Sequence, residues 1–439
     1  MNDKVAVAES KNHSNIYMIF CLLLLFFYLY PVYFKFFPLP TDRILQAFGL
    51  GLIGLKLFFF QKFSINRKLF IILCTSAFMA FLSFLSIQQA KYADSYLIKW
   101  FFNIVLNCLS AYFIIWYIDS KVVRVTIGRL LDFVIYVGLI QACISFYFFF
   151  NPSQYSLFTS LLKADVVEGV TNRLGLLQIR LMGIGNTFFG AVITYSVDLL
   201  ILSTLPYITG SRIYKNKWMY WSSITIIAIA GILSGRTFFI TIFITIILVI
   251  YNERRRLIEL TRSSAKVIFI ISILGMFLVI PFQSLLDINR LERVWDFAFE
   301  LFINYSDSGS LDTNSSQKMA DMIRLPSKLS TWLVGDGMIL EMDGSYYKHI
   351  DLGFIRLLYY FGIFGIFAFL VAQIIYFKIL SSFFRKKEAK MFCLFLFFLV
   401  VMLNMKGLAN IDNYVILFII AGIWERNKER NIATQSLSK

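Results

Sequence analysis

Long apolar runs recur throughout this chain, and they constrain its fold more than any other feature. The chain has 439 residues, of which 59% are hydrophobic and 48 are Phe, whereas only 15% are charged. An α-helix needs about 20 apolar residues to cross the hydrocarbon core of a bilayer. Inside that core every backbone polar group must find a partner within the protein, which favours helices. The sequence therefore predicts an all-α, polytopic membrane protein whose residues 1–439 form a single helical bundle.

About twelve apolar runs are long enough, or nearly so, to be transmembrane helices. The predicted spans are Ile16–Phe37, Ile44–Phe60, Leu69–Ile87, Leu97–Ile118, Leu130–Phe150, Ile184–Thr209, Trp218–Ser234, Thr237–Tyr251, Val267–Leu286, Phe354–Leu380, Met391–Leu403 and Tyr414–Trp424.

Lys and Arg gather in every second connection between these spans. The basic connections are 62–68, 121–129, 212–217, 254–266 and 385–390. Short loops rich in Lys and Arg stay on the cytoplasmic side of a membrane. We therefore expect both termini to be cytoplasmic. Two long loops, 151–183 and 287–353, are then predicted to lie on the outer face.

The overall charge and the cysteines argue against a nucleic-acid-binding protein and against a disulfide framework. The net charge is +16, but its basic residues are dispersed among the spans and not gathered on one domain, so no nucleic-acid partner is expected. All five Cys lie inside apolar runs and are predicted to be small buried side chains. The sequence contains no Walker A loop, no HExxH and no GxGxxG, so neither a metal nor a cofactor is expected.

The loop 287–353 is the longest polar segment between two apolar runs. It spans roughly 65 residues, and a loop that long in a compact protein is usually functional or disordered. Its aromatic residues, among them Trp295 and Trp332, are too many for a solvated linker. Apolar residues recur at helical spacing from about Arg290 to Ile303, which predicts an amphipathic helix. A second short helix is predicted over 315–323, and a turn over 335–337. We expect this loop to fold as a cap over a site at the membrane surface.

Three groups of basic residues are predicted on the outer face. Arg173 and Arg180 lie in the first long loop, Arg236 lies in the short turn 234–237, and Lys348 and Arg356 lie near the start of the tenth span. A charge at membrane depth is costly and indicates a functional site. The guanidinium group matches phosphate oxygens, so these arginines favour a lipid-linked phosphate or pyrophosphate. The alternative for Arg236 is an interfacial position or a carboxylate partner.

His349 and Asp351 are the candidates for a catalytic base. A carboxylate can hold an imidazole in one tautomer, and such a pair would deprotonate a sugar hydroxyl. Asp351 is also a candidate base by itself. The alternative is a solvated His349 and an Asp351 that caps the tenth span. Asp336, together with Lys348 and Arg356, is a candidate substrate-binding residue.

Three segments of the chain resemble a known family. Trp332 to Gly337, followed by His349 to Gly365, resembles the loop-to-helix junction of Wzy-type O-antigen and capsule repeat-unit polymerases. The region 172–190 resembles their Arg-bearing loop. Ser234-Gly235-Arg236-Thr237 resembles a Ser-Arg turn that they share with the related O-antigen ligases.

This resemblance implies a glycosyltransferase of the cytoplasmic (inner) membrane that acts in lipopolysaccharide or other polysaccharide biosynthesis. Donor and acceptor would both be oligosaccharides linked to undecaprenyl pyrophosphate, and a chain-length regulator protein would be a further partner. Arg173, Arg180 and Arg236 would bind the pyrophosphate, and His349 or Asp351 would lie near the attacking hydroxyl. Positive charge opposite a departing pyrophosphate stabilises the transition state without a metal.

Two other functions remain open at this point. An O-antigen ligase would perform the same chemistry with a lipid A core as acceptor. A flippase or transporter of lipid-linked oligosaccharides would carry polar residues at mid-membrane. The apolar runs hold few charges, Lys56, Asp132 and Asp198 being the exceptions, which favours the polymerase.

Overall fold

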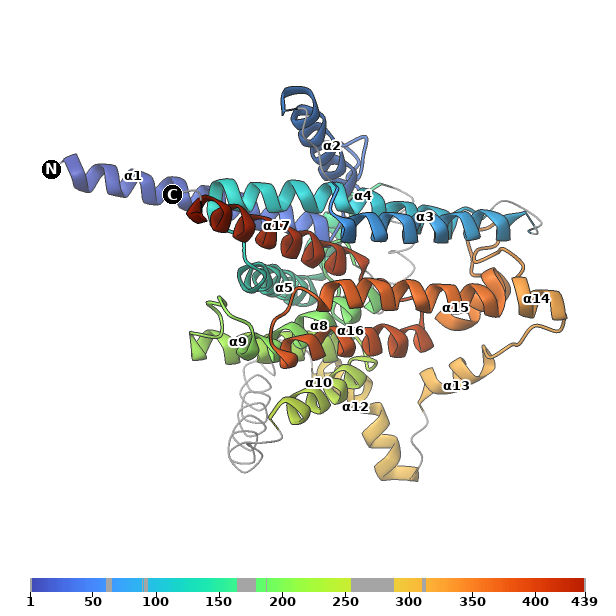
Figure 1. The fold of residues 1–439 in the computed structure, drawn as a ribbon. Helices are drawn as coiled ribbons and strands as arrows, with labels where there is room; N and C mark the ends of the chain where they lie inside the picture. The colour runs from blue at the N-terminus through green and yellow to red at the C-terminus, as the bar shows by residue number, and fades with distance from the viewer. Residues whose placement is uncertain are drawn as a thin grey trace.

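A computed structural model describes residues 2–60, 65–88, 90, 94–163, 179–186, 188–253, 288–309 and 313–437. In these ranges all regular structure is helical, and strand pairing is limited to two isolated bridges (Figure 1). The α-helices are α1 (Asn2–Leu29), α2 (Thr41–Phe60), α3 (Arg67–Ile87), α4 (Tyr96–Tyr117), α5 (Ile127–Phe150), α6 (Pro152–Ser160), α8 (Phe188–Thr204), α9 (Lys217–Ser234), α10 (Phe238–Glu253), α12 (Ile288–Ser308), α13 (Asn314–Asp321), α14 (Leu329–Val334), α15 (Gly353–Ser381), α16 (Lys387–Lys406) and α17 (Asp412–Leu437). The all-α prediction is confirmed.

Six described helical segments are long and apolar enough to cross a membrane. They are Arg67–Ile87, Tyr96–Val122, Ile127–Phe150, Phe188–Tyr207, Gly353–Ser381 and Lys387–Lys406. Two shorter apolar helices, Asn15–Leu29 and Phe238–Asn252, accompany them. The prediction of a membrane protein is therefore confirmed at the level of these helices. The predicted ninth span, Val267–Leu286, lies outside the described residues.

The first helix begins before the apolar run and ends before the run does. The predicted span ends at Phe37, whereas α1 ends at Leu29. Pro31 explains the early end, because a proline disfavours helical backbone in the residue before it. The chain then leaves the helix, and Phe34 forms an isolated bridge with Leu162 next to the first long loop.

The long helices lie side by side, and the two ends of the bundle differ. Both termini lie at one end, while α13 and α14 lie at the opposite end, beside the start of α15 (Figure 1). Helix α8 is at the centre, packed against α5, α9, α10 and α16, and it is the most deeply buried of the six candidate spans. Helices α9 and α16 both end on the side where α15 begins, so their C-terminal residues lie on the same side as the cap.

The cap approaches the bundle closely at two glycines, Gly335 in the cap and Gly362 in α15. Gly335 and Gly362 both have positive φ, 81° and 67°, which L side chains rarely adopt. A Cβ at Gly335 would lie 2.3 Å from the Tyr360 carbonyl oxygen, and a Cβ at Gly362 would lie 2.3 Å from that of Leu333. Helix α14 therefore crosses α15 in backbone contact, at the point where Gly362 interrupts the helical backbone of α15.

A buried carboxylate strengthens this junction. Asp94, between α3 and α4, accepts hydrogen bonds at its Oδ2 from the backbone N–H groups of Ile339 (2.6 Å) and Leu340 (2.9 Å). The Tyr360 hydroxyl donates to the Asp94 carbonyl oxygen (3.1 Å). Hydrogen bonds to a charged group are stronger than neutral ones. Asp94 therefore fixes the second half of the cap relative to the bundle.

The amphipathic helix predicted in the cap is present as α12. Its Phe299 and Phe302 contact Phe239 of α10, with ring centroids 6.4 and 5.6 Å apart. Trp295 lies against Phe299 at 4.3 Å and remains 53% exposed. An amphipathic helix with exposed aromatic rings is typical of the membrane interface. The short helix α13 and the turn at Gly335 and Gly337 also follow the sequence prediction.

Candidate functional site

The turn between α9 and α10 brings the first two arginines together. Helix α9 ends at Ser234, and Gly235 follows in extended backbone. The Arg180 Nε–H donates to the Ser234 carbonyl oxygen (3.0 Å), and the Leu181 N–H donates to Leu233 O (3.1 Å). A Cβ at Gly235 would lie 2.9 Å from Arg180 Nη2. The glycine therefore makes room for the Arg180 guanidinium beside the turn.

Arg180 and Arg236 share one aromatic ring. The guanidinium carbon of each lies 4.9 Å from the centre of the Phe297 ring of α12. Arg180 also lies over Phe188 at 4.6 Å. A guanidinium over an aromatic face is stabilised by cation–π attraction, and more so when it is shielded from water. Phe297 thus holds two positive charges close together despite their mutual repulsion.

Arg236 is also paired with a carboxylate of the cap. Its Nη1 forms an ion pair with Glu300 Oε2 of α12, and the two side chains are only 20% and 18% exposed. The carboxylate partner considered for Arg236 from the sequence is therefore present. Burial lowers the pKa of the Arg236 guanidinium. The usual arginine pKa is so high that the group remains protonated at neutral pH.

Lys406, at the C-terminal end of α16, is a third cation at this place. It interacts electrostatically with Arg236, Arg180 and Asp351. We name Arg180, Arg236 and Lys406 the cationic cluster. Lys406 ends an apolar run and resembles an ordinary helix-terminal lysine, so nothing in the sequence marks it as a site residue. The packing of α16 on α8 and α10 places its C-terminal end near the two arginines.

Asp351 and His349 are not partners of each other. Asp351 forms an ion pair with Arg356, with 3.7 Å between Asp351 Oδ1 and Arg356 Nη1. Helix α15 is capped at Leu352 without a side-chain hydrogen bond, so Asp351 does not act as its N-cap. His349 is exposed and attracts Asp343 instead. The expected imidazole–carboxylate pair is therefore not formed in this structure.

Hydrogen bonds from Ser345, with a smaller attraction from His349, hold the pKa of the Asp343 carboxyl below its usual value. Lys348 and His349 both adopt left-handed backbone, with φ of 56° and 59°. Non-glycine residues in this region are uncommon and the conformation costs free energy. The segment that carries His349 is thus held in a strained turn at the edge of the cap.

Asp336 and Lys348 brace the cap internally. The hydroxyls of Thr331 and Tyr347 donate to the Asp336 carboxylate at 2.6 and 3.2 Å. Lys348 Nζ lies 3.9 Å from Asp336 Oδ2 and 4.1 Å from the centre of the Tyr359 ring. Burial and the Asp336 carboxylate raise the pKa of the Tyr347 hydroxyl, which keeps it a donor. These contacts involve two of the five side chains that the sequence assigned to substrate binding.

Arg356 is the most deeply buried of the predicted site residues that the structure describes. Its side chain is 5% exposed, and its guanidinium carbon lies 4.0 Å from the centre of the Tyr346 ring. Its Nε–H donates to no acceptor among the described residues. Arg356 is thus a buried positive charge that pairs with the more exposed Asp351. Arg173, the remaining predicted arginine, lies outside the described residues.

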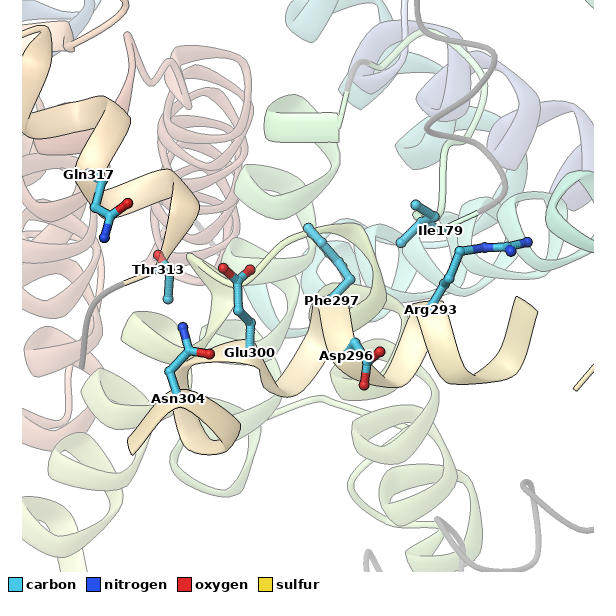
Figure 2. Close-up of a pocket in the computed structure, with 8 residues that line it drawn as sticks. All are labelled: Ile179, Arg293, Asp296, Phe297, Glu300, Asn304, Thr313 and Gln317. Atoms are coloured by element: carbon cyan, nitrogen blue, oxygen red, sulfur yellow. The ribbon is translucent and has the colours of Figure 1, made fainter. Parts of the chain in front are cut away.

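A cavity of about 510 Å³ opens next to the cationic cluster (Figure 2). It lies along α12, with Glu300 and Phe297 on its wall. In the part of the chain that the structure describes, no three His, Cys, Asp or Glu side chains come together as metal ligands would. Comparison with protein families, with curated proteins and with solved structures finds no match to this chain.

Proposed function

We propose that this chain is a glycosyltransferase of the cytoplasmic membrane that polymerises oligosaccharide repeat units carried on undecaprenyl pyrophosphate. In this proposal about twelve spans cross the membrane and both termini are cytoplasmic. The segments 151–183 and 287–353 then face the outside, where O-antigen, capsule or exopolysaccharide units are joined.

The cationic cluster is the observation that carries the proposal. Arg180, Arg236 and Lys406 come from three different segments and converge at the end of the bundle that the cap covers. Like charges gathered in a partly buried place repel each other, and the ion pair between Glu300 and Arg236 offsets part of this repulsion. A bound anion would offset it further. A pyrophosphate next to the membrane surface supplies that anion, and guanidinium groups match its oxygens.

The same residues supply the chemistry of glycosyl transfer. The acceptor hydroxyl oxygen attacks the anomeric carbon of the donor sugar, and the bond from that carbon to the pyrophosphate oxygen breaks. The leaving pyrophosphate keeps the electron pair, and the cationic cluster stabilises the charge that develops there. Asp351 accepts the hydroxyl proton, since it is 55% exposed and lies within electrostatic range of Lys406. Arg356 pairs with this carboxylate and orients it.

A gel of surface polysaccharide tests the proposal. A strain that lacks the gene is complemented with the wild-type chain or with Arg236→Ala, and the membrane level of each protein is measured. We expect single repeat units without a ladder in the deletion strain and in Arg236→Ala. Long chains at wild-type abundance in Arg236→Ala would contradict the role of the cationic cluster. Loss of all attached polysaccharide, with polymer accumulating on the lipid carrier, would indicate a ligase.

One observation favours a transporter as the second candidate. Asp198 of α8 is fully buried, and no described residue donates a hydrogen bond to either of its carboxylate oxygens. An ionisable group at such a place in a membrane protein indicates a functional site. Gly138 of α5 makes room for the Asp198 side chain, because a Cβ at Gly138 would lie 2.2 Å from Asp198 Oδ2. For a polymerase, Asp198→Asn should leave the ladder intact. A lost ladder with lipid-linked units retained on the inner leaflet would favour the transporter.

A further inference from the structure

The cavity beside α12 has a wall with a definite chemical character. Most of the residues that line the cavity belong to α12. Arg293, Phe297, Glu300 and Asn304 follow one another at intervals of three or four residues, which places them on one face of the helix, and Asp296 lies next to Phe297 in the sequence. Figure 2 shows the side chains of Phe297, Glu300 and Asn304 rising from one side of α12, with Thr313 and Gln317, at and near the start of α13, beside them. The lining includes Arg293, Asp296, Phe297, Glu300, Asn304 and Gln317.

This lining suits a polyhydroxylated ligand better than an anion or a lipid tail. Carboxylates and amides offer both acceptors and donors, and sugar hydroxyls both donate and accept. The lining holds two carboxylates, Asp296 and Glu300, against one guanidinium, Arg293, so on balance it would repel a bare anion. Its polar groups would lose their hydration against an acyl chain. The volume of about 510 Å³ lies within the range of sites for small molecules.

Two residues that line the cavity also contact the cationic cluster. Phe297 lines the cavity and also lies 4.9 Å from the guanidinium carbons of both arginines. Glu300 lines the cavity and also pairs with Arg236. A ligand with an anionic group at Arg180 and Arg236 would therefore place its neighbouring group in this cavity.

We propose that the cavity along α12 binds the sugar residues next to the pyrophosphate of the lipid-linked donor. This inference rests on the proposed function and assigns the sugar-recognition residues of the same site. Asp296 accepts hydrogen bonds from sugar hydroxyls, and the Asn304 amide both donates to them and accepts from them. The ring of Phe297 separates the sugar from the cationic cluster.

Two lipids separate this inference from the proposed function. Undecaprenyl pyrophosphate carries the anion alone, and the lipid-linked oligosaccharide extracted from the deletion strain carries the anion and the sugar. Binding of both is measured on the full-length protein in nanodiscs. The test variant is Asp296→Ala with Asn304→Ala, since alanine preserves the helix. The matched control, Glu292→Ala with Ser308→Ala, removes one carboxylate and one neutral polar group from the same helix outside the cavity.

We expect the wild-type protein to bind the oligosaccharide form about 30-fold more tightly, from two net hydrogen bonds. The test variant should lose most of this ratio and still bind undecaprenyl pyrophosphate normally, while the control keeps it. If the test variant bound neither lipid, Gln317→Ala on α13 would replace it, with a smaller loss of the ratio expected. A ratio that survives in these variants would overturn the inference and leave the proposed function standing. Weak binding of both lipids by the wild-type protein, unaffected by Arg236→Gln, would overturn the proposed function itself.

Discussion

Glu300 forms an ion pair with the guanidinium of Arg236, the group that would bind the pyrophosphate in the proposed function. The ligand must therefore displace Glu300, or bind beside it. Replacing Glu300 with Gln removes the competing charge and keeps the size of the side chain. We expect Glu300→Gln to bind undecaprenyl pyrophosphate more tightly than the wild-type protein does, because Arg236 no longer has to leave a carboxylate.

The magnitude follows from the burial of the pair. Two unit charges about 4 Å apart attract each other by about 4 kcal/mol at the effective dielectric constant of a protein surface. Desolvation of both groups offsets much of this attraction. With both side chains about four-fifths buried, we expect a net contribution of about 1–2 kcal/mol, between an exposed and a fully buried pair. When the ligand no longer has to break this ion pair, its affinity should increase by about 5- to 30-fold.

Binding is measured with undecaprenyl pyrophosphate in nanodiscs at two salt concentrations. Glu292→Gln is the control, because it removes the same charge from an exposed position on the same helix. It should change the affinity less than twofold, roughly the effect of one distant, screened charge. Unchanged or weaker binding in Glu300→Gln would refute the reasoning, since Glu300 would then orient Arg236 for the ligand and not compete with it.

Two further changes test the geometry of the site and of the cap. Arg180→Lys keeps the charge but loses the Nε–H bond to Ser234, so the affinity for undecaprenyl pyrophosphate should fall about tenfold, measured as above; an affinity equal to wild type would reduce Arg180 to a general positive charge. Gly335→Ala should loosen the cap, because its Cβ would meet the Tyr360 carbonyl oxygen in addition to the strain of positive φ. The control Gly344→Ala has positive φ but open space, so it should cost only about 1 kcal/mol; proteolysis of the cap at equal rates in both variants would contradict the close crossing.

Part of the candidate site was predictable because its residues are conspicuous in a sequence. Arg236 is the single charge in the connection between two apolar runs, and Arg180 lies in a long polar loop. A charge in such surroundings is costly unless it has a partner, so its presence alone indicates a site. The partner of Arg236 was not predictable. Glu300 is one of several carboxylates in the cap, and only the docking of α12 on α10 selects it.

Other residues changed their roles once their neighbours were known. His349 and Asp351 are close in sequence, but the left-handed backbone at His349 turns the chain between them. Asp351 then pairs with Arg356, one turn into α15. The short sequence separation therefore indicated His349 as the partner of Asp351, whereas the structure pairs Asp351 with Arg356. Lys406 and Asp94 carried no local signal, since both act through contacts with segments far away in the chain.

The sequence by itself determined the class of the protein and the approximate place of its helices. Apolar composition and run length decide these, because burial of apolar surface and of backbone polar groups depends on local residue type. The convergence of Arg180, Arg236 and Lys406, and the cavity along α12, were decided only by the tertiary structure. They depend on close backbone approach at glycines and on the direction in which distant helices pack, and no short stretch of sequence encodes either.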